Sequence, residues 1–311
     1  MPASENLPRI VAIVGPTASG KSSLAFRLAQ EVRGEIISAD SMKVYRRMDI
    51  GTAKPSPEER SAVPHHLVDI LEPDQEYSAA LFRKQAEAVI NRLHQNHVPV
   101  FVAGGTGLYL KVLTHGLFHG PGADPELRRE LKEKVTREGV ASLYEELLRM
   151  DPAAASRIQN RDIFRIIRAL EVYRQSGKPI SRFQEEHGFH EKPYKVLKIG
   201  LFWRREELYR RVDGRVERMI ASGWIEEVRS LLQQGYSRDL KAMKSLGYRQ
   251  LAAHLLCEMG LAETISLIKR DTRRFVKRQM TWFRADEEIQ WVFPGEDHYS
   301  EIREKMRVFL R

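Results

Sequence analysis

Short apolar runs alternate with amphipathic stretches in the first third of the chain. Residues 10–14 and 98–103 are apolar runs that are too short for helices and stand next to glycine, which predicts buried parallel strands. Residues 35–38 predict a third strand of the same kind. One amphipathic segment follows the strand at 10–14 and another precedes the strand at 98–103. Alternation of strand and helix is typical of a parallel α/β sheet. The fold class expected is therefore α/β, with a phosphate-loop-type parallel sheet core flanked by helices.

The best-defined early helix is expected over residues 78–96. Ser78 stands directly before the periodic stretch and predicts an N-cap. Helical spacing predicts that the inward face consists of Leu81, Phe82, Ala86, Val89, Ile90 and Leu93.

The pattern changes between residues 116 and 194, where the strand signal disappears. Asp124-Pro125 and Asp151-Pro152 each resemble an N-cap followed by proline at the first helical position, and Gly177 is typical of a helix C-terminus. We expect a small all-helical insertion domain at 116–194, with residues 1–115 and 195–311 forming a discontinuous catalytic core.

The last third of the chain returns to the first pattern. Residues 198–203 predict a returning strand, and residues 206–235 predict helix with an interruption near Gly223. A long helix is expected over 261–284 and a terminal helix over 296–311. In the long helix, spacing predicts that the inward side chains are Ile265, Ile268, Phe275 and Trp282.

Composition restricts the class of protein. No apolar run reaches about 18 residues and the N-terminus lacks the features of a secretory signal, so we expect a cytoplasmic protein. Cys257 is the single cysteine, which excludes an internal disulfide. The formal net charge of +9 favours a polyanionic partner such as nucleic acid, although many basic proteins bind none.

The strand at residues 10–14 runs directly into a glycine-rich turn that fits G-x-x-x-x-G-K-[ST]. Glycines let the backbone N–H groups point at an anion, and the following helix N-terminus adds partial positive charge. Lys21 supplies a charge for the terminal phosphate, and the Ser22 hydroxyl can hold Mg²⁺ as the one metal ligand expected here. The turn binds a pyrophosphate, with a nucleotide as its commonest owner, and its residues are Gly15, Pro16, Thr17, Ala18, Ser19, Gly20, Lys21 and Ser22.

Two further stretches follow predicted strands and therefore belong at the same sheet edge. Asp40 follows the strand at 35–38, where it could hold Mg²⁺, act as a general base, or cap a helix over residues 42–48. The glycine cluster after residue 103 lets backbone approach a ligand closely and presents the Thr106 hydroxyl. Between them, residues 49–78 predict a long ordered loop or lid. Within that loop, the adjacent pair His65-His66 points two ways and lacks a third ligand, which disfavours a metal site.

Basic side chains gather in the predicted insertion. Arg161, Arg165 and Arg168 fall at i, i+4 and i+7 on one helix face, with isoleucines toward the other side. Such a face is either solvated or contacts phosphates.

These motifs together resemble the tRNA dimethylallyltransferase family. The D-S-x-x-x-Y and D-I-G-T-A-K-P pair carries most of the specificity, and the match extends in order over about residues 8–295. The matching segments are GPTASGKS (15–22), SADSMKVYRRMDIGTAKP (38–55), PHHLVDI (64–70), YSAALFR (77–83), AGGTGLYLK (103–111), RALEVYRQSGK (168–178) and GYRQ (247–250).

The resemblance implies transfer of a dimethylallyl group from dimethylallyl diphosphate to N6 of the tRNA adenine just 3′ of the anticodon, position 37, with Mg²⁺. Asp40 is then the general base, and Lys21 and Thr106 complete the catalytic set. The residues implied for binding the anticodon stem-loop are Asp40, Ser41, Met42, Lys43, Thr106, Arg128, Phe164, Arg165, Ile166, Ile167, Arg168, Lys244, Ser245, Leu246, Gly247, Tyr248 and Arg249. We expect a monomer with no membrane partner.

Two other functions fit parts of the pattern. A small-molecule or nucleoside kinase would use Asp40 and the glycine-rich turn for Mg·ATP, and would not need a basic insertion. A non-catalytic RNA-binding protein with a vestigial turn would keep its tRNA affinity after Lys21→Ala and carry out no chemistry.

Overall fold

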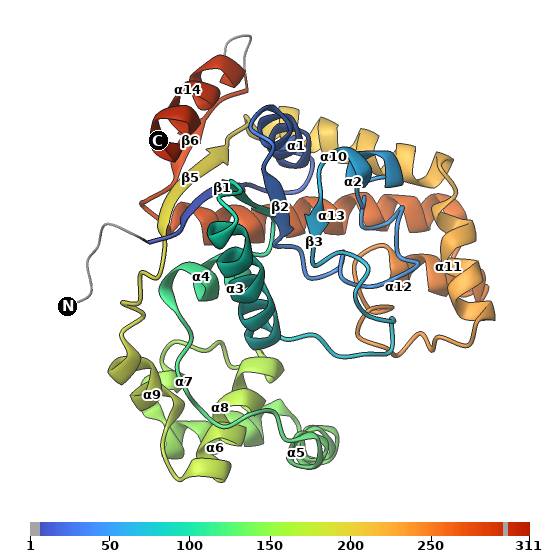
Figure 1. The fold of residues 1–311 in the computed structure, drawn as a ribbon. Helices are drawn as coiled ribbons and strands as arrows, with labels where there is room; N and C mark the ends of the chain where they lie inside the picture. The colour runs from blue at the N-terminus through green and yellow to red at the C-terminus, as the bar shows by residue number, and fades with distance from the viewer. Residues whose placement is uncertain (1–6, 295–297) are drawn as a thin grey trace. The chain divides into compact units, whose positions relative to one another are not determined.

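The computed structural model describes residues 7–294 and 298–311 and has one six-stranded parallel sheet (Figure 1). The strand order is β3-β2-β4-β1-β5-β6, and every pairing is parallel. This confirms the predicted fold class. The strands are β1 Arg9–Val14, β2 Glu35–Ser38, β3 His65–His66, β4 Val100–Gly104, β5 Lys195–Leu201 and β6 Gln290–Val292.

The chain divides into two compact units. One comprises residues 1–114 and 193–311 and the other residues 115–192. The helices of the first unit are α1 Lys21–Glu31, α2 Pro57–Ala62, α3 Ala79–Gln95, α4 Gly107–His115, α10 Arg205–Ala221, α11 Trp224–Gln233, α12 Tyr248–Leu255, α13 Leu261–Arg284 and α14 His298–Leu310. Those of the second are α5 Pro125–Glu138, α6 Val140–Met150, α7 Pro152–Ala155, α8 Ile163–Ser176 and α9 Ile180–His187.

Apolar side chains from helices and strands pack together in the core of the sheet unit. Leu24 and Leu28 of α1 and Ile302 and Met306 of α14 are buried in one cluster with side chains of the five strands β1, β2, β4, β5 and β6. Because alternate strand residues such as Val11 point to this side, α1 and α14 cover one face of the sheet. The α10 and α13 helices lie alongside each other in the same unit (Figure 1).

Local capping signals in the sequence are confirmed. The side chains of Ser78, Asp124 and Asp151 accept hydrogen bonds from backbone N–H groups at the starts of α3, α5 and α7. Gly177 ends α8 in the left-handed conformation, and Gly223 separates α10 from α11 with φ 94°. An N-cap needs a short side chain with an acceptor oxygen, and a positive φ favours glycine, so both can be recognised from the sequence alone.

Several sequence expectations are wrong. Residues 42–48 form turns rather than a helix, and the expected loop at 49–78 contains α2 and the edge strand β3. The returning strand β5 starts earlier and ends at Leu201. Leu81, expected inside, is exposed because it lies in the first turn of α3, beyond the edge of the packed face. The expected terminal helix partly lies outside the described residues, since 295–297 are not among them.

The buried face of α13 is also different from the prediction. Phe275 and Trp282 are 37% and 41% exposed, whereas Thr272, Val276 and Gln279 are buried. The buried face of α13 mixes apolar side chains such as Ile268 and Val276 with the polar Thr272 and Gln279, so apolarity alone did not identify it. The Thr272 hydroxyl donates to a carbonyl of the same helix, whereas Gln279 has its partners in the candidate site.

Candidate functional site

The glycine-rich turn joins β1 to α1 and has the geometry of an anion cradle. Gly15, Ala18 and Gly20 have φ of 145°, 64° and 95°, so the backbone curls with its N–H groups facing one side. Helix α1 starts at Lys21, its N-cap is Gly20 without a side-chain cap, and its first turn has no acidic residue. Its N-terminal N–H groups are thus left to an anionic ligand.

Three neighbouring strands bring the sequence-predicted residues to one edge. In the order β2-β4-β1, Asp40 follows β2, Thr106 follows β4 and the glycine-rich turn follows β1. Because all three strands are parallel, their carboxyl ends lie at the same edge of the sheet.

Asp40 and Thr106 belong to one backbone arrangement. The Thr106 Oγ1 accepts a hydrogen bond from the Ser41 N–H at 3.2 Å, and the Thr106 N–H donates to the Ala39 carbonyl at 3.2 Å. Gly104 is required nearby, since a Cβ there would lie 2.0 Å from the Ala39 oxygen. The Asp40 Oδ1 accepts from the Met42 N–H at 2.9 Å, which makes a turn and excludes the alternative that Asp40 caps a helix.

Gln279 of α13 connects two of these loops and escaped the sequence analysis. Its Oε1 accepts a hydrogen bond from the Thr17 N–H at 2.9 Å, and its Nε2 donates to the Gly105 carbonyl at 2.9 Å. Both contacts join segments more than 170 residues apart. No local signal could have revealed them, and a glutamine on a predicted surface helix looks ordinary.

Three cations surround Asp40. Burial, followed by the neighbouring Arg215 and Lys43, lowers the pKa of Lys21 to about 7. Burial also lowers the pKa of Lys43 and of Arg215, while Asp40 acts to raise both. Three cations with a single carboxylate repel one another, and a bound polyanion would offset that repulsion. Arg215 lies within α10 and was also missed from the sequence.

These groups line a cavity of about 720 Å³ inside the sheet unit. Lys21, Ser22, Asp40, Thr106 and Arg215 contribute to its wall, and so do the expected residues Ser41, Met42, Lys43, Lys244, Ser245, Leu246, Tyr248 and Arg249. A second cavity of about 350 Å³ shares Lys21, Ser22, Lys43, Ala53, Ala103 and Arg215 with the first. The cation cluster therefore lies where the two cavities meet.

The donor set of the cavity suits Mg²⁺ bound through a ligand. The Ser22 hydroxyl and the Asp40 carboxylate both line it, and hard oxygen ligands are those that Mg²⁺ prefers. Mg²⁺ usually keeps waters and completes its shell with substrate phosphates, so few protein ligands are needed. Neither His65 nor His66 lines the larger cavity, although His65 lines the second one: His65 Nδ1 contacts the Val63 carbonyl, and His66 Nε2 pairs with Glu35.

The arginines of the helical unit have different surroundings. Arg128 and Arg168 both bind the fully buried Glu171, at 2.8 and 2.6 Å, and Arg168 also donates to two loop carbonyls. Arg165 is 60% exposed at the start of α8, and the neighbouring Phe164 is 84% exposed. Arg161 precedes α8, so the expected three-arginine helix face is wrong at that residue.

Four of the residues expected to contact tRNA are buried in this structure. Ile166 and Ile167 pack in the core of the helical unit, because they lie on the side of α8 opposite Arg165. Gly247 is buried, and Tyr248 is 1% exposed with its hydroxyl donating to Glu227. Tyr248 still lines the larger cavity, whereas Ile166 and Ile167 pack inside the helical unit, and the role of these residues in tRNA binding stays a prediction. Lys244 and Arg249 of the same segment remain exposed.

Two family models match the sequence. The model described as IPP transferase matches residues 43–286, and the model described as isopentenyl transferase matches residues 8–68. The first spans more than half of the chain and includes most of the cavity wall. The second includes the glycine-rich turn and Asp40.

Known proteins resemble the chain along nearly its whole length. It is 53% identical over 292 residues to a tRNA dimethylallyltransferase of Geobacter metallireducens, covering 94% of each chain. It is 49% identical over 311 residues to tRNA dimethylallyltransferase 2 of Syntrophus aciditrophicus, covering 100% of this chain and 99% of the relative.

Solved structures agree. The tRNA isopentenylpyrophosphate transferase of Bacillus halodurans has TM-score 0.72 and 38% identity, covering 97% of each chain. A eukaryotic dimethylallyltransferase acting on tRNA has TM-score 0.81 and 26% identity, covering 96% of this chain and 77% of that chain.

Proposed function

Because the chain belongs to the tRNA dimethylallyltransferase family, we propose that it transfers a dimethylallyl group from dimethylallyl diphosphate to N6 of adenine 37 in tRNA. The observation that carries the proposal is the convergence of the glycine-rich turn, Asp40 and Thr106 on one cavity. A diphosphate cradle and a carboxylate in the same enclosed space suit a reaction in which diphosphate leaves and an amine loses a proton.

Asp40 is the proposed general base. The adenine N6 amine is a weak nucleophile because its lone pair is delocalised into the ring. As the N6–C1 bond forms and the C1–O bond of the donor breaks, one N6 proton passes to the Asp40 carboxylate and the bonding electron pair leaves with diphosphate. Asp40 is held for this role by the Met42 N–H, and Thr106 fixes the adjoining Ser41 backbone.

The leaving diphosphate gains charge at the cation cluster. Backbone N–H groups at the start of α1, together with the Lys21 and Arg215 side chains, would bind its oxygens and stabilise that charge as it develops. The Ser22 hydroxyl, which lines the cavity, would hold Mg²⁺, and the bound ion would add further charge stabilisation.

Adenine reaches the cavity only when it is unstacked, so the base must flip out of the anticodon loop. Within the sheet unit, Lys244 and Arg249 are exposed cations for the RNA backbone. Within the helical unit, Arg165 and Phe164 offer a charge and a stacking surface. Arg128 and Arg168 are proposed to act less directly, because Glu171 already holds both.

One assay tests the proposal. The protein is incubated with unmodified tRNA, Mg²⁺ and either dimethylallyl diphosphate or ATP, and diphosphate release and base mass are measured. We expect diphosphate release with a prenylated adenine from the first donor and no turnover of ATP. ATP consumption without tRNA prenylation would instead favour a kinase. A control with the adenine replaced by guanine should give no product.

A further inference from the structure

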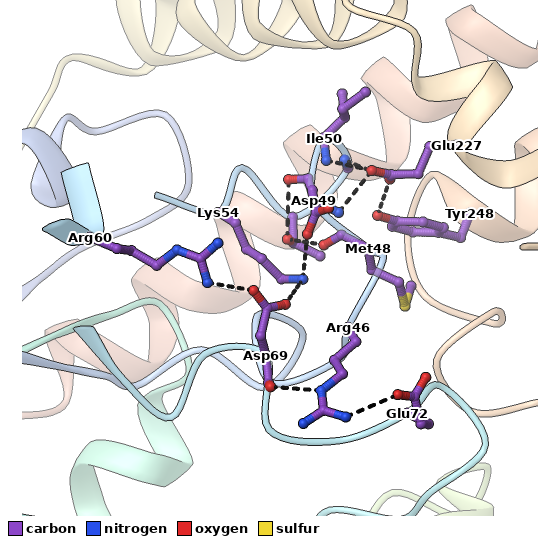
Figure 2. A network of polar contacts seen from close by, with 12 residues as sticks. Arg46, Met48, Asp49, Ile50, Lys54, Arg60, Asp69, Glu72, Glu227 and Tyr248 are labelled. Carbon is purple, nitrogen blue, oxygen red and sulfur yellow. Dashed lines mark hydrogen bonds and ion pairs between the residues drawn. The ribbon is translucent and has the colours of Figure 1, made fainter. Parts of the chain in front are cut away.

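The D-I-G-T-A-K-P segment stands out in the sequence, and the proposed reaction steps give it no role. The structure shows its first three residues wrapped around one carboxylate (Figure 2). The Asp49 and Ile50 N–H groups donate to Glu227 Oε2 at 2.8 and 2.7 Å, and the Gly51 N–H donates to Oε1 at 3.2 Å. Glu227 belongs to the first turn of α11, far away in the sequence.

Successive N–H groups that converge in this way form an anion-binding nest. The glycine-rich turn is a second structure of this kind, and it faces the cavity. The nest at residues 49–51 is instead filled by the protein's own carboxylate, so it serves to hold the segment in place. The Tyr248 hydroxyl also donates to Glu227 Oε1, at 2.6 Å, and orients the carboxylate.

The segment is also packed closely against aromatic side chains at Gly51. A Cβ at Gly51 would lie 2.1 Å from the Trp224 indole nitrogen and 2.6 Å from the Tyr248 ring. Glycine is therefore needed at this position, and the backbone lies directly against both aromatic side chains. Beyond it, Lys54 is buried between Asp49 and Asp69, which closes the segment at its other end.

What the nest holds is a piece of the cavity wall. Gly51, Thr52 and Ala53 line the larger cavity, and Ala53 also lines the smaller one. Ala53 shares that junction with Lys21 and Arg215, where the proposed function places the diphosphate. A shift of the segment would thus change the space around the prenyl diphosphate.

We propose that Glu227 is a positioning residue for the prenyl donor: its carboxylate, oriented by Tyr248, fixes residues 49–53 as the wall of the donor site. This inference rests on the proposed function for its kinetic part. Its structural part, the immobilisation of residues 49–51, stands independently of which reaction the protein carries out.

The test compares Glu227→Ala with Glu227→Gln and Tyr248→Phe. In Glu227→Ala, hydrogen exchange of a peptide spanning residues 48–54 should accelerate at least about tenfold, because three amide N–H groups lose their acceptor. The KM for dimethylallyl diphosphate should rise about tenfold, while the dissociation constant for tRNA stays within about twofold. Glu227→Gln keeps one acceptor oxygen, so its hydrogen exchange and its KM should lie close to those of the original protein. Tyr248→Phe should cause a small loss of the same kind.

The matched control is Glu226→Ala, one residue earlier on α11, where the side chain is 66% exposed and pairs with Arg229 at 3.5 Å. It should behave like the original protein in every measurement. Unchanged exchange over 48–54 in folded Glu227→Ala would overturn the inference. The inference would also be overturned if the activity of Glu227→Ala fell only in proportion to its folded fraction while the KM for dimethylallyl diphosphate stayed unchanged. Failure of the proposed function itself would show as no prenyl transfer by the unmodified protein.

Discussion

Gln279 and Thr17 are joined across 262 residues by a hydrogen bond of 2.9 Å between the Gln279 Oε1 and the Thr17 N–H. The other end of the same amide donates to Gly105. One buried side chain of α13 therefore fixes the spacing between the turn that cradles diphosphate and the loop that carries Thr106. An amide is suited to this position because it accepts on one side and donates on the other.

Gln279→Glu should weaken diphosphate binding. The carboxylate can still accept from Thr17, but it faces the Gly105 carbonyl without a proton to donate and adds negative charge beside the cradle. We expect the inhibition constant of diphosphate to rise about tenfold at pH 8, equivalent to about 1.4 kcal/mol. Inhibition kinetics with diphosphate measure it. Thr281→Ala, at an exposed position two residues along α13, is the control; equal inhibition in both variants would contradict the role of Gln279.

The pKa of Lys21, lowered to about 7, predicts a pH dependence of donor binding. A bound diphosphate favours the charged ammonium and raises that pKa, so above pH 7 binding must take up a proton. Affinity should therefore fall as pH rises from 7 to 9, by up to about tenfold per pH unit. Calorimetric titration of dimethylallyl diphosphate at pH 6.5 and 8.5, in buffers of different ionisation enthalpy, measures both effects.

Lys21→Met is the control for this dependence, because it removes the amine and leaves the ionisation of the ligand itself. The variant should bind more weakly and lose the extra decline of affinity above pH 7. If the unmodified protein and Lys21→Met declined in parallel, Lys21 would not be the titrating group.

Arg165→Ala should weaken tRNA binding without affecting the fold. The side chain is 60% exposed and stands 3.4 Å from Asp162, a surface pair of little energetic weight. Loss of one phosphate contact should reduce the slope of log affinity against log salt by about 1. Filter binding with unmodified tRNA over a range of salt concentrations measures it, and an unchanged slope would exclude Arg165 from the interface.

Arg128→Ala is the contrasting variant of the same unit. Burial opposes ionisation of Glu171, but hydrogen bonds from Arg128 and Arg168 outweigh it and lower the Glu171 pKa. Removing Arg128 leaves that carboxylate with fewer donors, and should reduce the free energy of unfolding by roughly 1–3 kcal/mol. Urea denaturation separates this effect from RNA binding. The two arginines thus differ in role although the sequence shows them as equally basic.

The strands β1, β2, β4 and β5 and several helix starts could be predicted from the sequence because each rests on local demands, whereas the short edge strands β3 and β6 were missed. The apolar run before Gly15 and the caps at Ser78 and Asp124 depend on neighbours within a few residues. Asp40 and Thr106 could be grouped because parallel strands place their carboxyl ends together.

The rest depended on packing between distant segments. Phe275 and Trp282 were expected inside because they are apolar, whereas the buried face of α13 carries Gln279 and Thr272. Arg215 and Glu227 lie on helices that the sequence marks as ordinary amphipathic ones. Their partners lie in residues 40–51, far away in the sequence. These contacts form only when the chain folds, so the hydrophobic periodicity cannot predict them.

The central claim is that Asp40 takes the proton from the attacking amine. The measurement that tests it most directly is single-turnover prenyl transfer by Asp40→Asn with saturating tRNA and dimethylallyl diphosphate. Asparagine keeps an oxygen for the Met42 N–H but cannot accept the proton, so the rate should fall about 10²- to 10⁴-fold while tRNA affinity is retained. A rate within a few-fold of the unmodified protein would contradict the account.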